Sequence, residues 1–260
     1  MPGKITRIAG IDLEVHEAGT GEPLLFLHSA QGFDERHEIA GLLAARHRLI
    51  APSHPGFGKS GLPDWLDSVD DIAYVYLELL DRLAIRSVDV VGCSIGGWIA
   101  AEMASKAPER IRKLVMVGPV RVKLGPVDRL DIPDIFAMPQ EAVDRLLYHD
   151  PARMKMDPSA MTDEEIAIRV RNRETLALLS WEPWMHNPKL KHRLQRAAMP
   201  SLFVRGERDG LVSPQYLEGY AALFRGARTL AIGDAGHAPH IEQPRAFAEA
   251  VLRFVDEASR

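Results

Sequence analysis

The chain has 260 residues, of which 46% are hydrophobic and 26% charged, and its formal net charge is −4. This length suits one large domain or a core with an insertion, and the small, scattered charge argues against a nucleic-acid partner or an anionic membrane surface. The lone cysteine, Cys93, excludes an intramolecular disulfide and a metal site built from cysteines. No apolar run approaches the roughly 20 residues that span a bilayer, and the first ten residues lack the apolar core of a signal peptide. We therefore expect a cytoplasmic protein, whose oligomeric state the sequence leaves open.

Short apolar segments alternate with longer amphipathic ones in the first half of the chain. Residues 11–17 alternate apolar and polar side chains, which predicts a strand with one wet face. Residues 24–28 and 88–92 are more continuously apolar, as in strands of a parallel sheet covered on both faces. Residues 70–83 carry apolar side chains at helical spacing, and the Ala-rich residues 96–106 predict a second helix. The same patterns recur later in the chain: strands over 114–117 and 202–205, and helices over 214–223 and 244–255.

The middle of the chain breaks this alternation. Residues 121–195 contain repeated prolines and no convincing strand, but they predict a helix over 139–148 and a second helix that begins with a capping box at 162–165. An apolar stripe continues along the second helix: Ile166, Val170, Ala177 and Leu178. We therefore predict an α/β core formed by residues 1–120 and 196–260, with residues 121–195 inserted into it as an all-helical cap.

The segment VVGCSIGG, residues 90–97, is the most informative about chemistry. It runs from an apolar strand into the pattern G-x-S-x-G and then directly into a helix. A serine on such a sharp turn has a strained backbone, and glycines two residues before and after it avoid collisions. The serine hydroxyl then projects into a cleft, where the N-terminus of the helix presents backbone N–H groups to a developing oxyanion. Ser94 is therefore the candidate nucleophile; the alternative, a helix-capping serine, leaves both glycines unexplained.

A serine nucleophile needs a base, and the base needs an acid that orients it. After this kind of turn, the expected chain order is serine, acid, histidine. Asp209 follows an apolar strand, at the end where open α/β sheets place their ligand sites, and His237 follows another short strand after a glycine. Glu207 is the rival for the acid, whereas Asp234 precedes the histidine by too few residues and is expected to shape its turn.

Segments spread over nearly the whole chain, in a fixed order, resemble the α/β-hydrolase superfamily, and in particular its capped esterases and carbon–carbon-bond hydrolases: LFLHSAQGFD, SHPGFGKSG, VVGCSIGGW, VRGERDGLVSP and GDAGHAPHIEQP. The resemblance implies that Ser94 is the nucleophile, Asp209 the acid and His237 the base. It also assigns the two N–H donors of the oxyanion hole to Ala30 and Ile95.

The same resemblance suggests roles for several other residues. Ser29 replaces the glycine that usually follows the histidine of the first motif, so its hydroxyl is a candidate for substrate contact. Trp184 and Met185 of the cap are further candidates for lining the substrate pocket, although aromatic residues at helical spacing are more often core. His28 is expected to be a structural histidine beneath the oxyanion loop, and His240 is less suitable as the base than the glycine-framed His237.

These observations predict a serine hydrolase that cleaves small-molecule carboxylic esters through an acyl-enzyme, with no cofactor and no metal. The same triad could instead cleave a carbon–carbon bond in a ring-fission product, open a lactone or make peracids. A dehalogenase or epoxide hydrolase is disfavoured, because those relatives need a carboxylate where Ser94 stands. From a different class of protein, a non-catalytic ligand receptor on the same fold remains an alternative.

Overall fold

The protein is built around an eight-stranded sheet with the strand order β1-β2-β4-β3-β5-β6-β7-β8. The computed structural model describes residues 2–126, 128–155, 157–181 and 186–258. β2 pairs antiparallel with both β1 and β4, and all later pairs are parallel, so the predicted α/β class is confirmed. The strands are β1 (Lys4–Ile8), β2 (Ile11–Ala18), β3 (Pro23–Leu27), β4 (Arg48–Pro52), β5 (Val88–Cys93), β6 (Ile111–Val117), β7 (Ser201–Gly206) and β8 (Arg228–Ile232).

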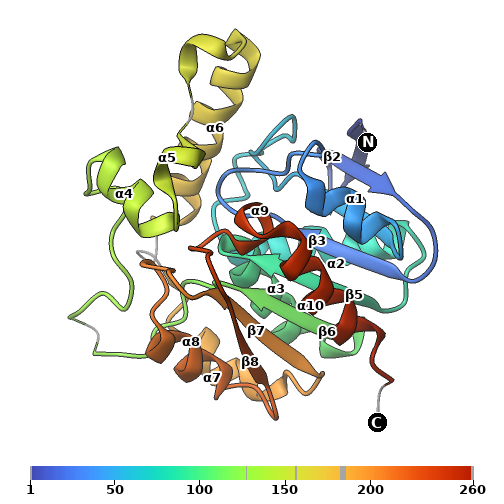
Figure 1. The fold of residues 1–260 in the computed structure, drawn as a ribbon. Coiled ribbons are helices and arrows are strands. Elements are labelled where there is room, and N and C mark those ends of the chain that lie inside the picture. Colours follow the sequence, from blue (N-terminus) through green and yellow to red (C-terminus); the bar gives the residue numbers. More distant parts are fainter. Residues whose placement is uncertain (1, 127, 156, 182–185, 259–260) are drawn as a thin grey trace.

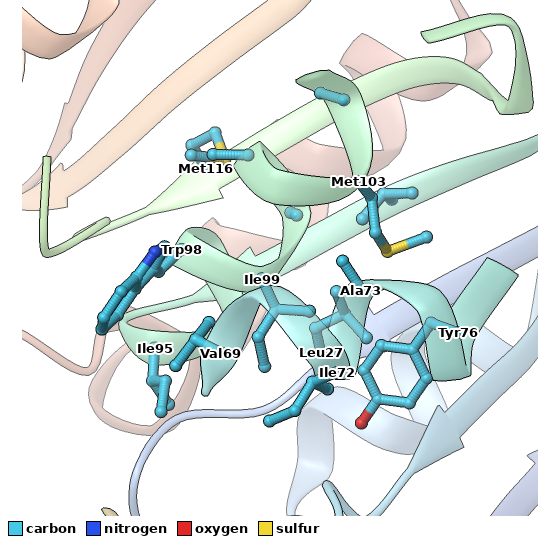
Figure 2. Close-up of a cluster of buried hydrophobic side chains, with 14 of the residues drawn as sticks. Leu27, Val69, Ile72, Ala73, Tyr76, Ile95, Trp98, Ile99, Met103 and Met116 are labelled. Atoms are coloured by element: carbon cyan, nitrogen blue, oxygen red, sulfur yellow. The ribbon is translucent and has the colours of Figure 1, made fainter. Parts of the chain in front are cut away.

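Helices cover both faces of this sheet (Figure 1). Successive residues of a strand point to opposite faces, so Leu24 and Phe26 of β3 pack in a cluster with α1 and α10, whereas Leu25 and Leu27 pack in a cluster with α2, α3 and α8. Figure 2 shows part of the second cluster, where side chains of α3 meet those of α2. The core helices are α1 (Glu38–Ala44), α2 (Val69–Arg82), α3 (Ile95–Lys106), α8 (Pro214–Ala221), α9 (Pro239–Glu242) and α10 (Pro244–Asp256).

The chain between β6 and β7 contains four α-helices among its described residues: α4 (Gln140–Leu147), α5 (Pro151–Met154), α6 (Asp163–Leu179) and α7 (Leu190–Arg193). Figure 1 shows α4, α5 and α6 standing over one end of the sheet, with α6 rising away from it. The capping box predicted for α6 is present, since the Thr162 hydroxyl accepts from the Glu165 amide and the Glu165 carboxylate accepts from the Thr162 amide. We call residues 121–195 the insertion.

The apolar stripe predicted along α6 is not its buried face. Val170 and Leu178 are 62% and 58% exposed, and Ile166 is also exposed. The buried face instead includes the polar residues Asn172 and Thr175.

Helix α6 docks on the core through hydrogen bonds to loop backbone. The Asn172 side chain accepts from the Gly58 amide at 3.0 Å and donates to the Gln31 carbonyl at 3.1 Å. The Thr175 hydroxyl donates to the Gly56 carbonyl at 2.9 Å. The buried side of α6 is therefore mixed: Asn172 and Thr175 pair with loop backbone, and Leu176 and Leu179 pack in the apolar core.

Candidate active site

The sharp turn between β5 and α3 holds Ser94 in an unusual backbone conformation, with φ +56° and ψ −112°. The Ser94 amide donates to the Val117 carbonyl of the neighbouring strand at 2.8 Å, which fixes the turn. A Cβ atom at Gly92 would lie 2.5 Å from the Gly96 carbonyl oxygen, and a Cβ at Gly96 would lie 2.1 Å from the Leu27 carbonyl oxygen. Side chains at either position would therefore collide with backbone, which is the physical reason for the two glycines around the serine.

Three side chains from separate loops form a continuous hydrogen-bonded chain. His237 Nε2 lies 2.9 Å from Ser94 Oγ, and His237 Nδ1 lies 2.9 Å from Asp209 Oδ2. The other carboxylate oxygen of Asp209 accepts from the amides of Leu211 and Val212, both at 2.9 Å, so the acid is held from two directions. A hydrogen on Nδ1 that donates to Asp209 leaves Nε2 as the acceptor for the serine proton.

The two rival acids lie elsewhere on these turns. Glu207 is exposed, and its amide donates to the carbonyl of Ile232, the last residue of β8. Asp234 is also exposed, has φ +51° and lies 3.8 Å from His149. The structure therefore places Asp209 against the imidazole, and neither Glu207 nor Asp234.

A tight turn after β3 shapes residues 28–32, which we call the oxyanion loop after the role predicted for Ala30. The Gly32 amide donates to the Ser29 carbonyl at 3.0 Å, and the Ser29 hydroxyl accepts from the Gln31 amide at 3.4 Å. Ala30 lies in this turn, and both Ala30 and Ile95 line the same cavity as Ser94. Since Ile95 is the first residue of α3, its N–H has no acceptor one turn earlier in the helix and is available to a ligand oxygen.

Two buried histidines, His28 and His54, hold this loop in place through hydrogen bonds and ring stacking. His28 Nε2 accepts from the His54 amide at 2.9 Å, so the hydrogen is on Nδ1 and donates to the Ser29 carbonyl at 2.7 Å. The His54 ring stacks on His28 with 3.6 Å between centroids. Burial lowers the pKa of His28 to about 4, so this imidazole is neutral at neutral pH. His240 is buried near the rings of Phe26 and Phe247.

Gly118, at the end of β6, is a site residue that the sequence analysis missed. Its φ is +48°, and a Cβ there would lie 2.9 Å from both Cε1 and Nδ1 of His237 and 3.3 Å from Asp209 Oδ2. The imidazole can reach both its partners only because this position has no side chain. The sequence signal is slight: a glycine after an apolar strand and before Pro119.

The insertion holds the turns that carry the acid and the base. At the end of α4, the Leu146 carbonyl accepts from the Gly210 amide at 2.9 Å, and the Leu147 carbonyl accepts from the His237 amide at 2.6 Å. Tyr148, the next residue, accepts a hydrogen bond from the Gln31 side chain of the oxyanion loop. The insertion thus contacts all three loops around Ser94.

A narrow cavity of about 60 Å³ lies between the insertion and the sheet. Its lining is mostly apolar, and the insertion contributes Arg121, Ile135, Leu147, Tyr148 and Leu176, while Ser29 lines it from the core side. Two further pocket candidates, Trp184 and Met185, fall outside the described residues. Trp98 is buried, donates to Glu102 and does not line this cavity.

Neither a metal-ion site nor a membrane-spanning helix is found among the described residues. They contain no group of three or more His, Cys, Asp or Glu side chains that could hold a metal ion. Among the helices of the same part of the chain, none is long and apolar enough to cross a membrane.

The sheet order, the position of Ser94 on the sharp turn between β5 and α3, and the hydrogen-bonded chain of Ser94, His237 and Asp209 together define a hydrolase of the α/β class. Residues 24–250 match the profile of the alpha/beta hydrolase family. The chain belongs to this family, and the α/β-hydrolase fold predicted from the motifs is confirmed.

Similar proteins span the full length of the chain. A relative named 2-hydroxymuconate semialdehyde hydrolase, from Pseudomonas sp. (strain CF600), is 28% identical over 281 residues, which cover 96% of this chain and 92% of the relative. Among solved structures, a thermophilic esterase from Thermogutta terrifontis superposes with a TM-score of 0.78 at 21% identity, covering 98% of both chains. A meta-cleavage product hydrolase from Pseudomonas fluorescens IP01 superposes with a TM-score of 0.75 at 21% identity, covering 99% of both.

Proposed function

We propose that this protein is a serine hydrolase that cleaves carboxylic esters through an acyl-enzyme. The observation that carries the proposal is the chain of hydrogen bonds from Asp209 through His237 to Ser94, which ends in a cavity that Ala30 and Ile95 also line. In this proposal the insertion is a cap that closes the substrate site, with Ser29 on its core side. The reaction needs no cofactor.

The proposed reaction has two halves. Ser94 Oγ attacks the ester carbonyl while His237 Nε2 takes its proton, and Asp209 holds the ring and stabilises the imidazolium. The N–H groups of Ala30 and Ile95 donate to the oxyanion, an interaction worth about 3–4 kcal/mol per donor. His237 then protonates the departing alcohol. A water molecule, deprotonated by the same imidazole, releases the acid in the second half.

Cleavage of a carbon–carbon bond in a ring-fission product is the second candidate. It is supported by the names of two similar proteins, the 2-hydroxymuconate semialdehyde hydrolase and the meta-cleavage product hydrolase. The ester candidate is supported by the similar esterase. The two candidates share the nucleophile and base and differ in the leaving group, which is an alkoxide in one and a carbanion equivalent in the other.

A substrate panel combined with active-site labelling tests the proposal. We expect turnover of short p-nitrophenyl esters above that of a ring-fission dienoate, and stoichiometric labelling by a fluorophosphonate. Ser94→Ala should abolish labelling and lower the rate on the order of 10⁴–10⁶-fold with an unchanged circular dichroism spectrum. Ser29→Ala, which removes another hydroxyl from the same cavity, should still be labelled.

Three outcomes would change the assignment. Preference for the dienoate would favour the carbon–carbon hydrolase. Labelling without turnover of esters, lactones or the dienoate would support Ser94 as the nucleophile and contradict the proposed substrate class. Absence of both labelling and turnover in the wild-type protein would favour the ligand receptor.

A further inference from the structure

Arg121 is a buried basic residue in the lining of the cavity that contains Ser94. It follows β6 by a few residues and lines the cavity together with Ser94, Ile95 and His237. The residue is only 5% exposed, so its guanidinium group is removed from bulk water. Its backbone φ is +75°, a region that a residue with a side chain rarely adopts. Glycine would occupy this position without strain, so the local backbone does not explain the arginine.

The guanidinium group lacks a full set of partners. Its Nη1 atom is buried and has no hydrogen-bond partner. Among the described residues, no carboxylate lies within ion-pair distance of it; Tyr216 and, to a smaller extent, Asp134 of the insertion act on its charge only through space. The Asp134 carboxylate itself accepts from the Phe136 amide. Burial lowers the pKa of Arg121 to about 10, so the group is still cationic at neutral pH.

The rest of the cavity does not neutralise this charge. The described residues that line it are apolar apart from Ser29, Gln31, Ser94, Tyr148, His237 and Arg121 itself, and none of them is acidic. A buried cation without a partner is strongly unfavourable unless a ligand supplies the opposite charge. The planar guanidinium matches a carboxylate in shape and binds it with paired, charge-assisted hydrogen bonds.

We propose that Arg121 binds a carboxylate that the substrate carries in addition to its scissile carbonyl. The natural substrate is then a small anionic molecule, such as the monoester of a dicarboxylic acid. This inference rests on the proposed function, because it assigns Ser94 and His237 to the reacting end of the same cavity. It makes Arg121 a specificity-determining residue.

Matched pairs of substrates test the inference. In one pair the carboxylate is in the acyl part: the mono-4-nitrophenyl ester of adipic acid and the corresponding terminal amide. In the other it is in the alcohol part: 4-acetoxybenzoate and 4-acetoxybenzamide. Each amide keeps the size of its acid and removes the charge. The measured quantity is kcat/KM for the acid divided by kcat/KM for the amide, after subtraction of the uncatalysed rate.

We expect the wild-type protein to prefer the acid in at least one pair. Arg121→Met should lower that ratio about tenfold to a hundredfold, as expected for loss of a charge-assisted contact. Arg121→Gly, which suits the left-handed backbone, provides a second variant if the first is poorly folded. Arg145→Met makes the same change of charge at an exposed position of α4 and should leave the ratio within twofold.

Binding of adipate, measured by calorimetry, separates this inference from the proposed function. Adipate binding that weakens at least tenfold in both Arg121 variants supports the inference even if no ester is turned over, in which case the ester assignment fails alone. Two results together would overturn the inference. They are equal kcat/KM for the acid and amide forms of each ester in the wild-type protein, and adipate binding that is unchanged in both Arg121 variants. The proposed esterase activity would then still be supported.

Discussion

At the scale of single residues, Gly118 decides whether the imidazole can sit between its two partners. A methyl group at this position would lie 2.9 Å from the His237 ring, and the positive φ would add strain. We expect Gly118→Ala to lower kcat/KM at least a hundredfold, because the ring must move away from Ser94 or Asp209. Steady-state kinetics on the preferred substrate measures the effect.

Gly226→Ala is the matched control for this change. Gly226 also has a positive φ, +68°, but a Cβ there would have no neighbour within 4 Å. Backbone strain alone should therefore destabilise both variants by about 1–2 kcal/mol, with activity lost only at Gly118. If both variants keep wild-type kinetics, the imidazole has room that the structure does not show.

Some residues of the candidate site could be predicted from the sequence and others could not, because only the first kind stand in a recognisable local pattern. Ser94, Asp209 and His237 each stand in a local pattern, a serine between glycines or a polar residue at the end of an apolar strand, that has a chemical meaning by itself. Gly118 and Arg121 matter because of what lies opposite them in space. Gly118 faces His237 across more than a hundred residues of sequence, and no local pattern encodes that contact.

At the scale of elements, α6 shows where helical periodicity misleads. Its apolar side chains Val170 and Leu178 point to solvent, while Asn172 and Thr175 bind loop backbone. The predicted stripe assumed that a helix buries its apolar face, which holds when the partner surface is apolar. Here part of the partner surface is loop backbone, whose amide and carbonyl groups pair with Asn172 and Thr175, while Leu176 and Leu179 pack in the apolar core. A sequence pattern on α6 alone cannot reveal this.

The sequence analysis predicted β2 as a strand with one wet face but missed β1, β4 and the antiparallel pairing of β2 with both. β1 and β4 are five residues each, and unlike the equally short β3 neither is a continuous apolar run: β1 contains Lys4, Thr6 and Arg7, and β4 begins with Arg48. A signal for β1 was available in the Ala9-Gly10 turn, where both residues have positive φ, 49° and 76°. Two such residues favour a tight hairpin to β2.

We expect Asn172→Ala to loosen the insertion from the core. The change leaves the Gly58 amide and the Gln31 carbonyl without their partner, and each lost hydrogen bond is worth about 1 kcal/mol. Chemical denaturation should show a loss of about 1–3 kcal/mol, and limited proteolysis should cut the insertion faster. Val170→Ala, on the exposed face of the same helix, should change stability by less than about 0.5 kcal/mol. The reverse order of the two variants would mean that the apolar stripe is the docking face after all.

At the scale of the whole molecule, buried histidines tie stability to pH. Burial lowers the pKa of His28 to about 4 and that of His240 to about 3, against about 6.5 in the unfolded chain. Below about pH 6.5 the unfolded chain therefore binds protons that the folded protein excludes. Stability is fully present above that pH and is lost as the pH falls towards the folded-state values, by about 1.4 kcal/mol per pH unit for each histidine.

His240→Phe isolates one of these contributions. His240 lies near the rings of Phe26 and Phe247, and its Nδ1 atom has no hydrogen-bond partner, so a phenyl ring suits the site. We expect stability at pH 7 to be equal to or above that of the wild type, and the slope of unfolding free energy between about pH 6 and 4 to fall by about 1.4 kcal/mol per unit. Urea denaturation across this range measures the slope. His192→Phe, at an exposed position of α7, should leave it unchanged; an equal change in both variants would contradict the assignment.

The last carbonyls of α4 accept hydrogen bonds from the turns that carry Asp209 and His237, so the insertion helps to hold the proposed catalytic residues in place. A chimera that takes the corresponding segment from another family member therefore also replaces the two α4 carbonyl groups that accept hydrogen bonds from Gly210 and His237. Lengthening α4 by one residue would rotate its final carbonyls by about 100° and turn them away from Gly210 and His237. Transfer of substrate preference between relatives thus requires that the last turn of α4 stay with the recipient, while the remainder of the segment is free to change.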